Sequence, residues 1–289
     1  MPSLDDYRHA HPDIRADFTI AQRPERYTSQ EHTLWRRLCV RMRDIHKGRA
    51  SQEYFDGLAR LPIDETGIPD FERLSDALYK LTKWIVVPVP GLVPDDVFFE
   101  HLANRRFPAG YFIRRPEQFD YIEEPDVFHD VYGHVPLLAH PVFAEYMEAY
   151  GKGGLRAMGF HSLDHLARLY WYTVEFGLIR NDAGLRVYGS GILSSPAETV
   201  YSIESSSPNR IHFDLERVMR TKYRIDDFQE SYFVVDSFDE LFSATYQDFA
   251  PLYRRLETGA TYEPGTVLAS DTVHTQGDHH YKAHSHQVA

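Results

Sequence analysis

Cysteine is nearly absent from the 289-residue chain, which contains only Cys39. A single cysteine cannot form a disulfide within the chain, so a disulfide-stabilised secreted scaffold is excluded. Cys39 follows Leu38 in a pattern typical of a helix, and we expect it to be a small buried hydrophobic side chain. The cysteine content therefore fits a protein of the reducing cytoplasm.

Long apolar runs and an excess of positive charge are also missing. No apolar window reaches the roughly 18–20 residues that a membrane-spanning helix needs. The first residues lack the basic start and the apolar stretch of a signal peptide. The formal net charge of −12 disfavours a nucleic-acid backbone or an anionic membrane as the main partner. We therefore expect a soluble cytoplasmic protein that binds neither nucleic acid nor membrane.

The composition that remains suits a large aromatic core. Apolar residues make up 43% of the chain, with 19 Tyr and 18 Phe. Helical periodicity dominates, a few short strands interrupt it, and no internal repeat divides the chain. We predict an α+β fold, mostly α, with one main domain over residues 23–263. A polar lead-in over residues 1–22 precedes it, and a His-rich tail over 264–289 is expected to be disordered.

Local signals predict several element boundaries. Thr28-Ser-Gln-Glu31 is a capping box that opens a helix ending near Gly48. Two prolines in Ile85–Val93 indicate a rigid apolar loop instead of a strand. The other predicted elements are helices over 51–60, 69–84 and 141–150, the last stopped by glycines at 151–154, and strands over 111–115 and 185–193.

Two histidines stand five residues apart in the mostly apolar stretch Pro125-Asp-Val-Phe-His129-Asp-Val-Tyr-Gly-His134-Val-Pro136. On an ideal α-helix such residues are about 140° apart and lie on different faces. We expect Gly133 and Pro136 to end a short helix, with His129 in its last turns and His134 at its exit. The alternative is a pair of ordinary, partly buried histidines.

Glu175 lies in the aromatic segment Tyr170-Trp-Tyr-Thr-Val-Glu-Phe-Gly-Leu178, and its helical neighbours are apolar. An ionised carboxylate there costs several kcal/mol unless it is paired or bound to a metal. A salt bridge to Arg168 or Arg180 is the structural alternative to a metal. Two imidazoles and a carboxylate suit Fe(II) with open positions, and they also suit a catalytic Zn(II). The residues alone leave both metals open.

Three motifs in order, the two quoted above and Tyr188-Gly-Ser-Gly-Ile-Leu-Ser-Ser195, resemble the pterin-dependent aromatic amino acid hydroxylases. The similarity extends from about residue 23 to 263 and is greatest with the bacterial phenylalanine-hydroxylating branch. It implies that His129, His134 and Glu175 bind Fe(II), and that O₂ and a tetrahydropterin are used to convert L-phenylalanine to L-tyrosine.

The resemblance also implies residues for the amino acid. Arg114 matches an arginine that grips the substrate carboxylate, as a planar guanidinium can do with two bonds. Ser194 matches a serine that assists at the same carboxylate, and Trp171 matches an aromatic residue of the pocket. Ile122 stands where the family commonly has a threonine, which leaves one carboxylate contact unaccounted for.

The pterin site is implied in the same way. Gly91, Leu92 and Val93 match a loop whose backbone binds the edge of the pterin, and Phe98 matches a ring that stacks on it. Asp130 stands near the pterin, where the family often has glutamate. A further position, Tyr170, corresponds to a tyrosine beside the iron.

Substrate choice is predicted from two positions. Ile225 stands where the tyrosine-specific branch tends to have aspartate, and Trp171 favours phenylalanine over tryptophan. Hydroxylation of tyrosine or tryptophan is one alternative, and a zinc hydrolase with the same three ligands is another. Without a regulatory domain before the catalytic region or a leucine heptad after it, the chain is expected to be a monomer.

Overall fold

Helices form most of the computed structural model, which describes residues 4–120, 122, 124–160 and 162–281. The predicted α+β class, mostly α, is confirmed. The α-helices are α1 Leu4–Arg8, α2 Ser29–His46, α3 Gln52–Arg60, α4 Phe71–Thr82, α5 Asp95–Ala103, α6 Val135–Leu138, α7 Pro141–Met158, α8 Leu163–Tyr170, α9 Ser190–Leu193, α10 Pro196–Glu204, α11 Leu215–Met219, α12 Phe238–Thr245 and α13 Ala250–Thr258. Short 3₁₀ helices lie at η1 Pro24–Arg26 and η2 Pro116–Gln118, and π-helices at η3 Phe128–His134 and η4 Trp171–Glu175. The strands are β1 Ile85–Val89, β2 Arg106–Gly110, β3 Leu178–Asn181, β4 Gly184–Val187, β5 Asn209–His212, β6 Ser231–Val235 and β7 Val273–Thr275.

Helix α2 begins where its predicted capping box places it, and side-chain caps also open the next two helices. Thr28 and Glu31 form the capping box of α2, with both reciprocal bonds present. Ser51 caps α3 and Asp70 caps α4, each through its side-chain oxygen. These caps depend on residues within one turn, so the sequence is sufficient to locate them. In the described part of the chain, no helix has the length and apolar character needed to cross a membrane.

The prediction that Ile85–Val93 is only a loop is wrong in its first half. Residues 85–89 form β1, which pairs in parallel with β2 in a sheet of two strands. Because β1 has only one neighbour, Pro88 can occupy it without breaking a second row of ladder bonds. The strand predicted over 111–115 in fact lies at 106–110, directly before it.

Helix α7 continues through the glycines that were expected to stop it. A β-carbon at Gly154 would lie 2.0 Å from Cδ1 of Phe99 in α5, and one at Gly151 would lie 2.3 Å from the backbone nitrogen of Ala103. The glycines therefore allow α5 to pack closely against α7. They do not act as a helix terminator, because tertiary packing outweighs their low helix propensity.

A five-stranded sheet with strand order β4-β3-β6-β5-β7 forms the C-terminal side of the molecule. The predicted strand over 185–193 is split, because β4 ends at Val187 and Ser190 begins helix α9. Part of the segment that was expected to be disordered forms β7, which pairs antiparallel with β5. Residues 282–289 of that segment lie outside the described residues.

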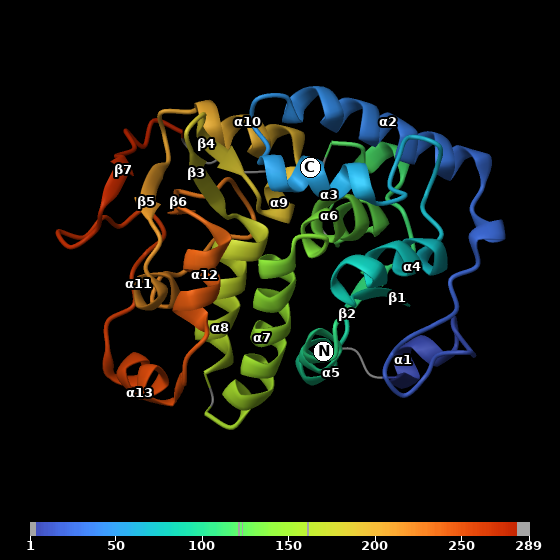
Figure 1. Ribbon diagram of the computed structural model, residues 1–289, viewed down its shortest axis with the longest axis horizontal. Helices are drawn as coiled ribbons and strands as arrows, with labels where there is room; N and C mark the ends of the chain where they lie inside the picture. Colours follow the sequence, from blue (N-terminus) through green and yellow to red (C-terminus); the bar gives the residue numbers. More distant parts are fainter. Residues whose placement is uncertain (1–3, 121, 123, 161, 282–289) are drawn as a thin grey trace, which may run out of the picture.

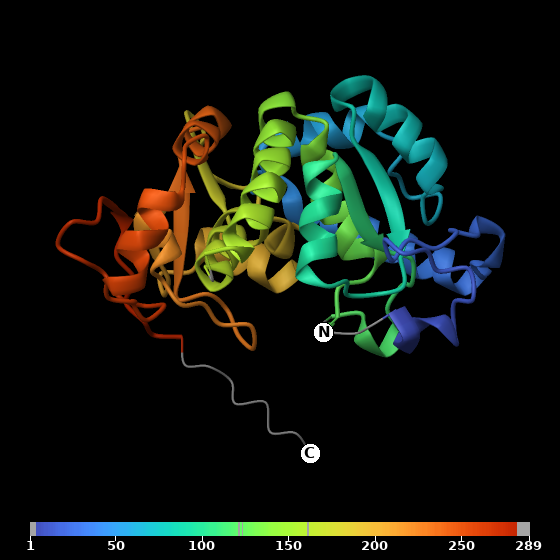
Figure 2. The same cartoon turned by 90° about the horizontal axis from the view of Figure 1, so that it is seen from below.

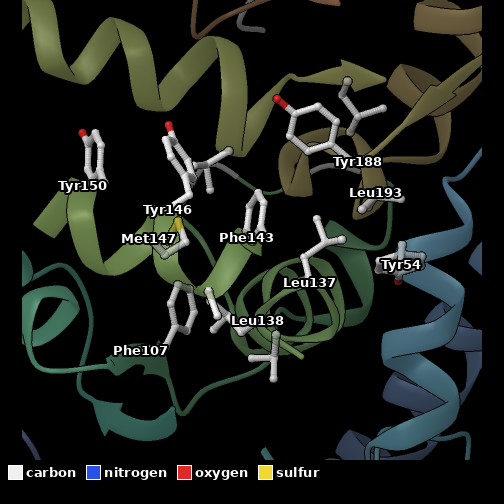
Figure 3. Packing of buried hydrophobic residues seen from close by; sticks show 14 of the residues in the cluster. Tyr54, Phe107, Leu137, Leu138, Phe143, Tyr146, Met147, Tyr150, Tyr188 and Leu193 are labelled. Atoms are coloured by element: carbon white, nitrogen blue, oxygen red, sulfur yellow. The ribbon is translucent and has the colours of Figure 1, made fainter. Parts of the chain in front are cut away.

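Helices α7 and α8 run side by side between the two sheets (Figures 1 and 2). Figure 3 shows buried side chains that α7 contributes. Met147 lies toward Leu138 of α6 and Phe107 of β2, whereas Tyr146 points away from them, and its hydroxyl meets Thr173 of η4. The two π-helices, η3 and η4, bear the polar residues described next.

Candidate active site

The two histidines lie on one π-helix, and the predicted helix exit between them is wrong. Residues Phe128–His134 form η3, which continues directly into α6 with Pro136 inside that helix. The i→i+5 hydrogen bonding of a π-helix brings residues five apart onto one face. The Nε2 atoms of His129 and His134 are therefore 3.1 Å apart, which an α-helix would not permit.

Glu175 ends the second π-helix and completes the cluster. Its Oε1 lies 3.2 Å from Nε2 of His134, and its Oε2 lies 3.6 Å from Nε2 of His129. Neither predicted salt bridge is found among the described residues, since Arg168 bonds the carbonyl of Met219 and Arg180 pairs with another carboxylate. The three side chains are 5–15% exposed, so the cluster is largely shielded from water.

Two serines determine which imidazole nitrogens carry protons. The Ser190 hydroxyl donates to the carbonyl of Val174 at 2.7 Å, so it accepts from Nδ1 of His134 at 2.8 Å. The Ser194 hydroxyl donates to the carbonyl of Ser190 at 2.9 Å, so it accepts from Nδ1 of His129 at 2.8 Å. Both Nδ1 atoms are therefore protonated, and both Nε2 atoms present lone pairs to the centre of the cluster.

This arrangement fits a metal ion. Burial lowers the pKa of His129 to about 4, which keeps the ring neutral. For Glu175, burial opposes ionisation, whereas the backbone N–H of Gly191 favours the ionised carboxylate. The cluster consists of two neutral imidazoles and a carboxylate, with one donor atom of each within 4.8 Å of the others. Their lone pairs point at a common centre, where a cation would remove their mutual repulsion. Imidazole anchored through its second nitrogen is the usual arrangement of a metal-ligating histidine.

Arg114 is buried beside the cluster and is held by Asp126. Its Nε and Nη2 donate to the two carboxylate oxygens of Asp126 at 2.8 and 2.9 Å, and both side chains are at most 3% exposed. Asp126 also accepts from the backbone N–H of His129 at 3.0 Å. The Asp126 carboxylate thus joins the Arg114 guanidinium to the start of the π-helix. Nη1 of Arg114 takes no part in the ion pair with Asp126.

Trp171 is clamped between two rings. Phe176 stacks on it with centroids 4.7 Å apart, and Tyr223 does so at 4.3 Å. The indole N–H donates to Oε1 of Gln229 at 2.9 Å, and Gln229 is buried. A tryptophan held by a hydrogen bond and two stacked rings has little rotational freedom, so it presents a fixed edge.

A row of aromatic rings connects α5 to the cluster. Phe98 contacts Tyr170 with centroids 5.8 Å apart, and Tyr170 lies 6.3 Å from the ring of His134. Asp130, next to His129, accepts from the backbone N–H of Gly110 at 2.7 Å. Burial raises the pKa of Asp130 to about 7, so its charge changes near neutral pH.

The loop Gly91–Val93 lies between β1 and α5, and Leu92 is 58% exposed. Tyr7 of α1 donates its hydroxyl to the carbonyl of Leu92 at 3.1 Å. A β-carbon at Gly91 would lie 2.9 Å from Oε1 of Glu124. The lead-in and the loop are thus in contact, which nothing in the sequence indicated.

Comparison with known proteins gives one consistent result. The family model of the biopterin-dependent aromatic amino acid hydroxylases matches residues 5–276. The chain belongs to this family. It is 57% identical over 264 residues to a phenylalanine-4-hydroxylase of Ralstonia nicotianae, covering 91% of this chain and 84% of the relative. It is 56% identical to that of Caulobacter vibrioides, covering 93% and 92%. The iron- and phenylalanine-bound structure of phenylalanine hydroxylase from Chromobacterium violaceum superposes with a TM-score of 0.88 at 51% identity, covering 94% of this chain and 100% of that one.

In this hydroxylase, the structure brings most of the predicted site residues around the cluster. Ser194 is hydrogen-bonded to His129 itself. Ile225 is 73% exposed, on the loop that carries Tyr223. Ile122 is half-buried between two residues outside the described set.

Sequence reasoning missed three residues of the hydroxylase site: Asp126, Ser190 and Gln229. Asp126 lies within the quoted histidine motif, and only that position hinted at a role. Ser190 lies within the quoted Gly-Ser-Gly run, where only its position in a motif hinted at a role. Gln229 had no signal, because its contact with Trp171 spans 58 residues.

Proposed function

We propose that this chain is a phenylalanine 4-monooxygenase that uses Fe(II), a tetrahydropterin and O₂ to convert L-phenylalanine to L-tyrosine. The observation that carries the proposal is the cluster of two Nδ1-anchored imidazoles and a buried carboxylate. Membership of the biopterin-dependent family and the identity of about 55–57% to three bacterial phenylalanine-4-hydroxylases support iron over the zinc-hydrolase alternative.

His129, His134 and Glu175 would hold the iron through Nε2, Nε2 and the carboxylate. Bound iron and tetrahydropterin supply the electrons and the O₂ activation that place one oxygen atom on the aromatic ring. Ser190 and Ser194 keep each imidazole in the tautomer that presents Nε2. Because the three ligands occupy one side of the centre, the other side is left for the reactants.

Arg114 would bind the carboxylate of phenylalanine through its Nη1 edge, since Asp126 engages the Nε and Nη2 edge. Asp126 thereby sets the orientation of the guanidinium relative to His129. Trp171 would form a wall for the aromatic ring, immobilised by Gln229 and its stacked neighbours. A fixed wall and a fixed guanidinium hold the substrate ring in a single position near the iron. Ile225 would act on substrate choice from the edge of this region.

The pterin would lie between Phe98 and the loop Gly91-Leu92-Val93, with Asp130 nearby. Phe98 provides a ring for stacking, and the loop provides backbone donors and acceptors. Tyr170 contacts both Phe98 and His134, so it would link the pterin side to the iron side. These apolar rings also limit water at the reacting centre.

The deciding experiment supplies purified protein with Fe(II), tetrahydropterin, O₂ and an equal mixture of phenylalanine, tyrosine and tryptophan. Product analysis should show tyrosine formed from labelled phenylalanine as the main product. Absence of tyrosine with iron bound would contradict the proposal. Predominant hydroxylation of tryptophan or tyrosine would support the alternative specificities within the family.

We also propose that the enzyme is a cytoplasmic monomer. The single cysteine is buried, and burial raises the pKa of its thiol, which fits a reducing compartment. Light scattering after gel filtration should give the mass of one chain, about 33.6 kDa. A dimer or tetramer mass would refute the monomer.

A further inference from the structure

A second group of metal-ligating side chains lies at the carboxyl ends of the parallel strands of the large sheet. Strands β3 and β5 both run parallel to β6. His212 is the last residue of β5, Asp236 follows β6, and Glu240 lies in the first turn of α12. One donor atom from each lies within 4.8 Å of the others. The carboxyl ends of parallel strands are where open sheets commonly bind ligands.

Protein groups orient both carboxylates of this group. Oε2 of Glu240 accepts from the backbone N–H of Asp236 at 2.6 Å, while Oε1 lies 2.9 Å from Nε2 of His212. Oδ1 of Asp236 accepts from Nε and Nη2 of Arg180 at 3.2 and 3.0 Å. Ligating carboxylates are held by such outer hydrogen bonds in known metal sites.

His274 of β7 adds an unexplained polar atom beside the group. Its ring lies edge-on to His212, with centroids 5.7 Å apart. Its Nδ1 accepts from Nη1 of Arg180 at 3.1 Å, so the proton of the neutral ring is on Nε2. That Nε2 is buried and has no hydrogen-bond partner within the described residues.

We propose that His212, Asp236 and Glu240 form a second site, for a divalent transition metal of the Zn(II) class. One imidazole and two carboxylates are a common set of three protein ligands, with water in the fourth position. A metal-bound water would give the Nε2–H of His274 its missing acceptor. The ion joins β5 to the β6–α12 connection, so its role is to stabilise this edge of the sheet. The site shares no residue with the iron cluster and does not rest on the proposed reaction.

Zinc is the probe, and the protein is the full chain with iron loaded under anaerobic conditions. Simultaneous measurement of both metals after dialysis should show one zinc per chain in addition to one iron. His212→Gln and Glu240→Gln should each lower the zinc affinity at least about tenfold. Hydroxylation activity and iron content should stay unchanged in both variants.

The C-terminal histidines provide the matched control, because they are competing zinc ligands. A variant with His279, His280, His284 and His286 all changed to Gln should bind the extra zinc as tightly as the parent. Should His212→Gln fail to fold, Asp236→Asn tests the same site at a half-exposed position. The proposal is overturned if zinc binds only by displacing iron, if no extra zinc binds, or if the tail variant alone loses it.

Discussion

Replacing Ser190 with alanine tests how the serines prepare the imidazoles for a metal. Ser190 is buried, touches His134 only through Nδ1, and would not itself contact the ion. Its loss leaves the Nδ1–H of His134 and the carbonyl of Val174 without their partner. Loss of such an outer hydrogen bond typically costs 10–100-fold in metal affinity, or roughly 1.4–2.7 kcal/mol. We therefore expect Ser190→Ala to weaken Fe(II) binding by about that factor.

The matched control is Ser202→Ala, which removes an equally buried hydroxyl. The Ser202 hydroxyl donates to the carbonyl of Thr199 within its own helix, away from the cluster. Fe(II) affinity would be measured for both variants by competition with a chelator, together with the free energy of unfolding of the iron-free proteins. Equal iron affinity in the two variants would refute the tautomer argument, because the metal would then be indifferent to the Nδ1 anchor.

Three further outcomes follow from the packing and the charges. Gly154→Ala should lower the free energy of unfolding by about 1–3 kcal/mol, because its β-carbon meets an aromatic ring of α5. Gly153→Ala is the control and should be neutral or stabilising, because nothing lies within 4 Å of a β-carbon there. Urea unfolding of both variants compares them. Burial raises the pKa of Glu198 to about 7 from 4.5, so the folded state binds the proton more tightly. Its stabilising contribution is complete below the unfolded pKa and is lost as pH rises through about 7. Relative to Glu198→Gln, the parent should lose roughly 3 kcal/mol across that window, and parallel curves would contradict this. Asp126→Asn should raise the KM for phenylalanine and destabilise the fold by about 3–5 kcal/mol, because it leaves Arg114 buried without its counter-ion. Steady-state kinetics measures the first effect and denaturation the second. An unchanged KM would contradict a role of the Arg114 guanidinium in substrate binding.

The sequence was sufficient where structure depends on near neighbours. The capping box of Thr28 and Glu31 was predicted because its bonds span only three residues. The turn between β3 and β4 also follows from its local sequence, with Gly184 at a φ of +100°. Such features are fixed by backbone groups that one short segment must satisfy.

The sequence was insufficient where distant packing overrides local preference. Gly133 and Pro136 were expected to end a helix, but the chain widens into a π-helix and continues. A β-carbon at Gly133 would lie 3.0 Å from the carbonyl oxygen of Ser190, so this glycine serves the contact between η3 and α9. Only the folded arrangement of these two segments reveals that requirement.

The same distinction applies to the site. The apolar neighbours of Glu175 indicated an unusual carboxylate, and the five-residue spacing of His129 and His134 indicated that the backbone departs from an α-helix, although the predicted helix exit was wrong. Their meeting point and the serine anchors depend on contacts between residues 16 to 65 positions apart, such as Ser194 with His129. Local patterns can indicate the ligand types, but not the tautomers that prepare them.

The most direct test is an anomalous difference map at the iron edge from crystals of the iron-loaded protein. One strong peak is expected, bonded to Nε2 of His129, Nε2 of His134 and the carboxylate of Glu175, with both Nδ1 atoms still hydrogen-bonded to their serines. Iron at another place, or bound through either Nδ1, would contradict the central claim.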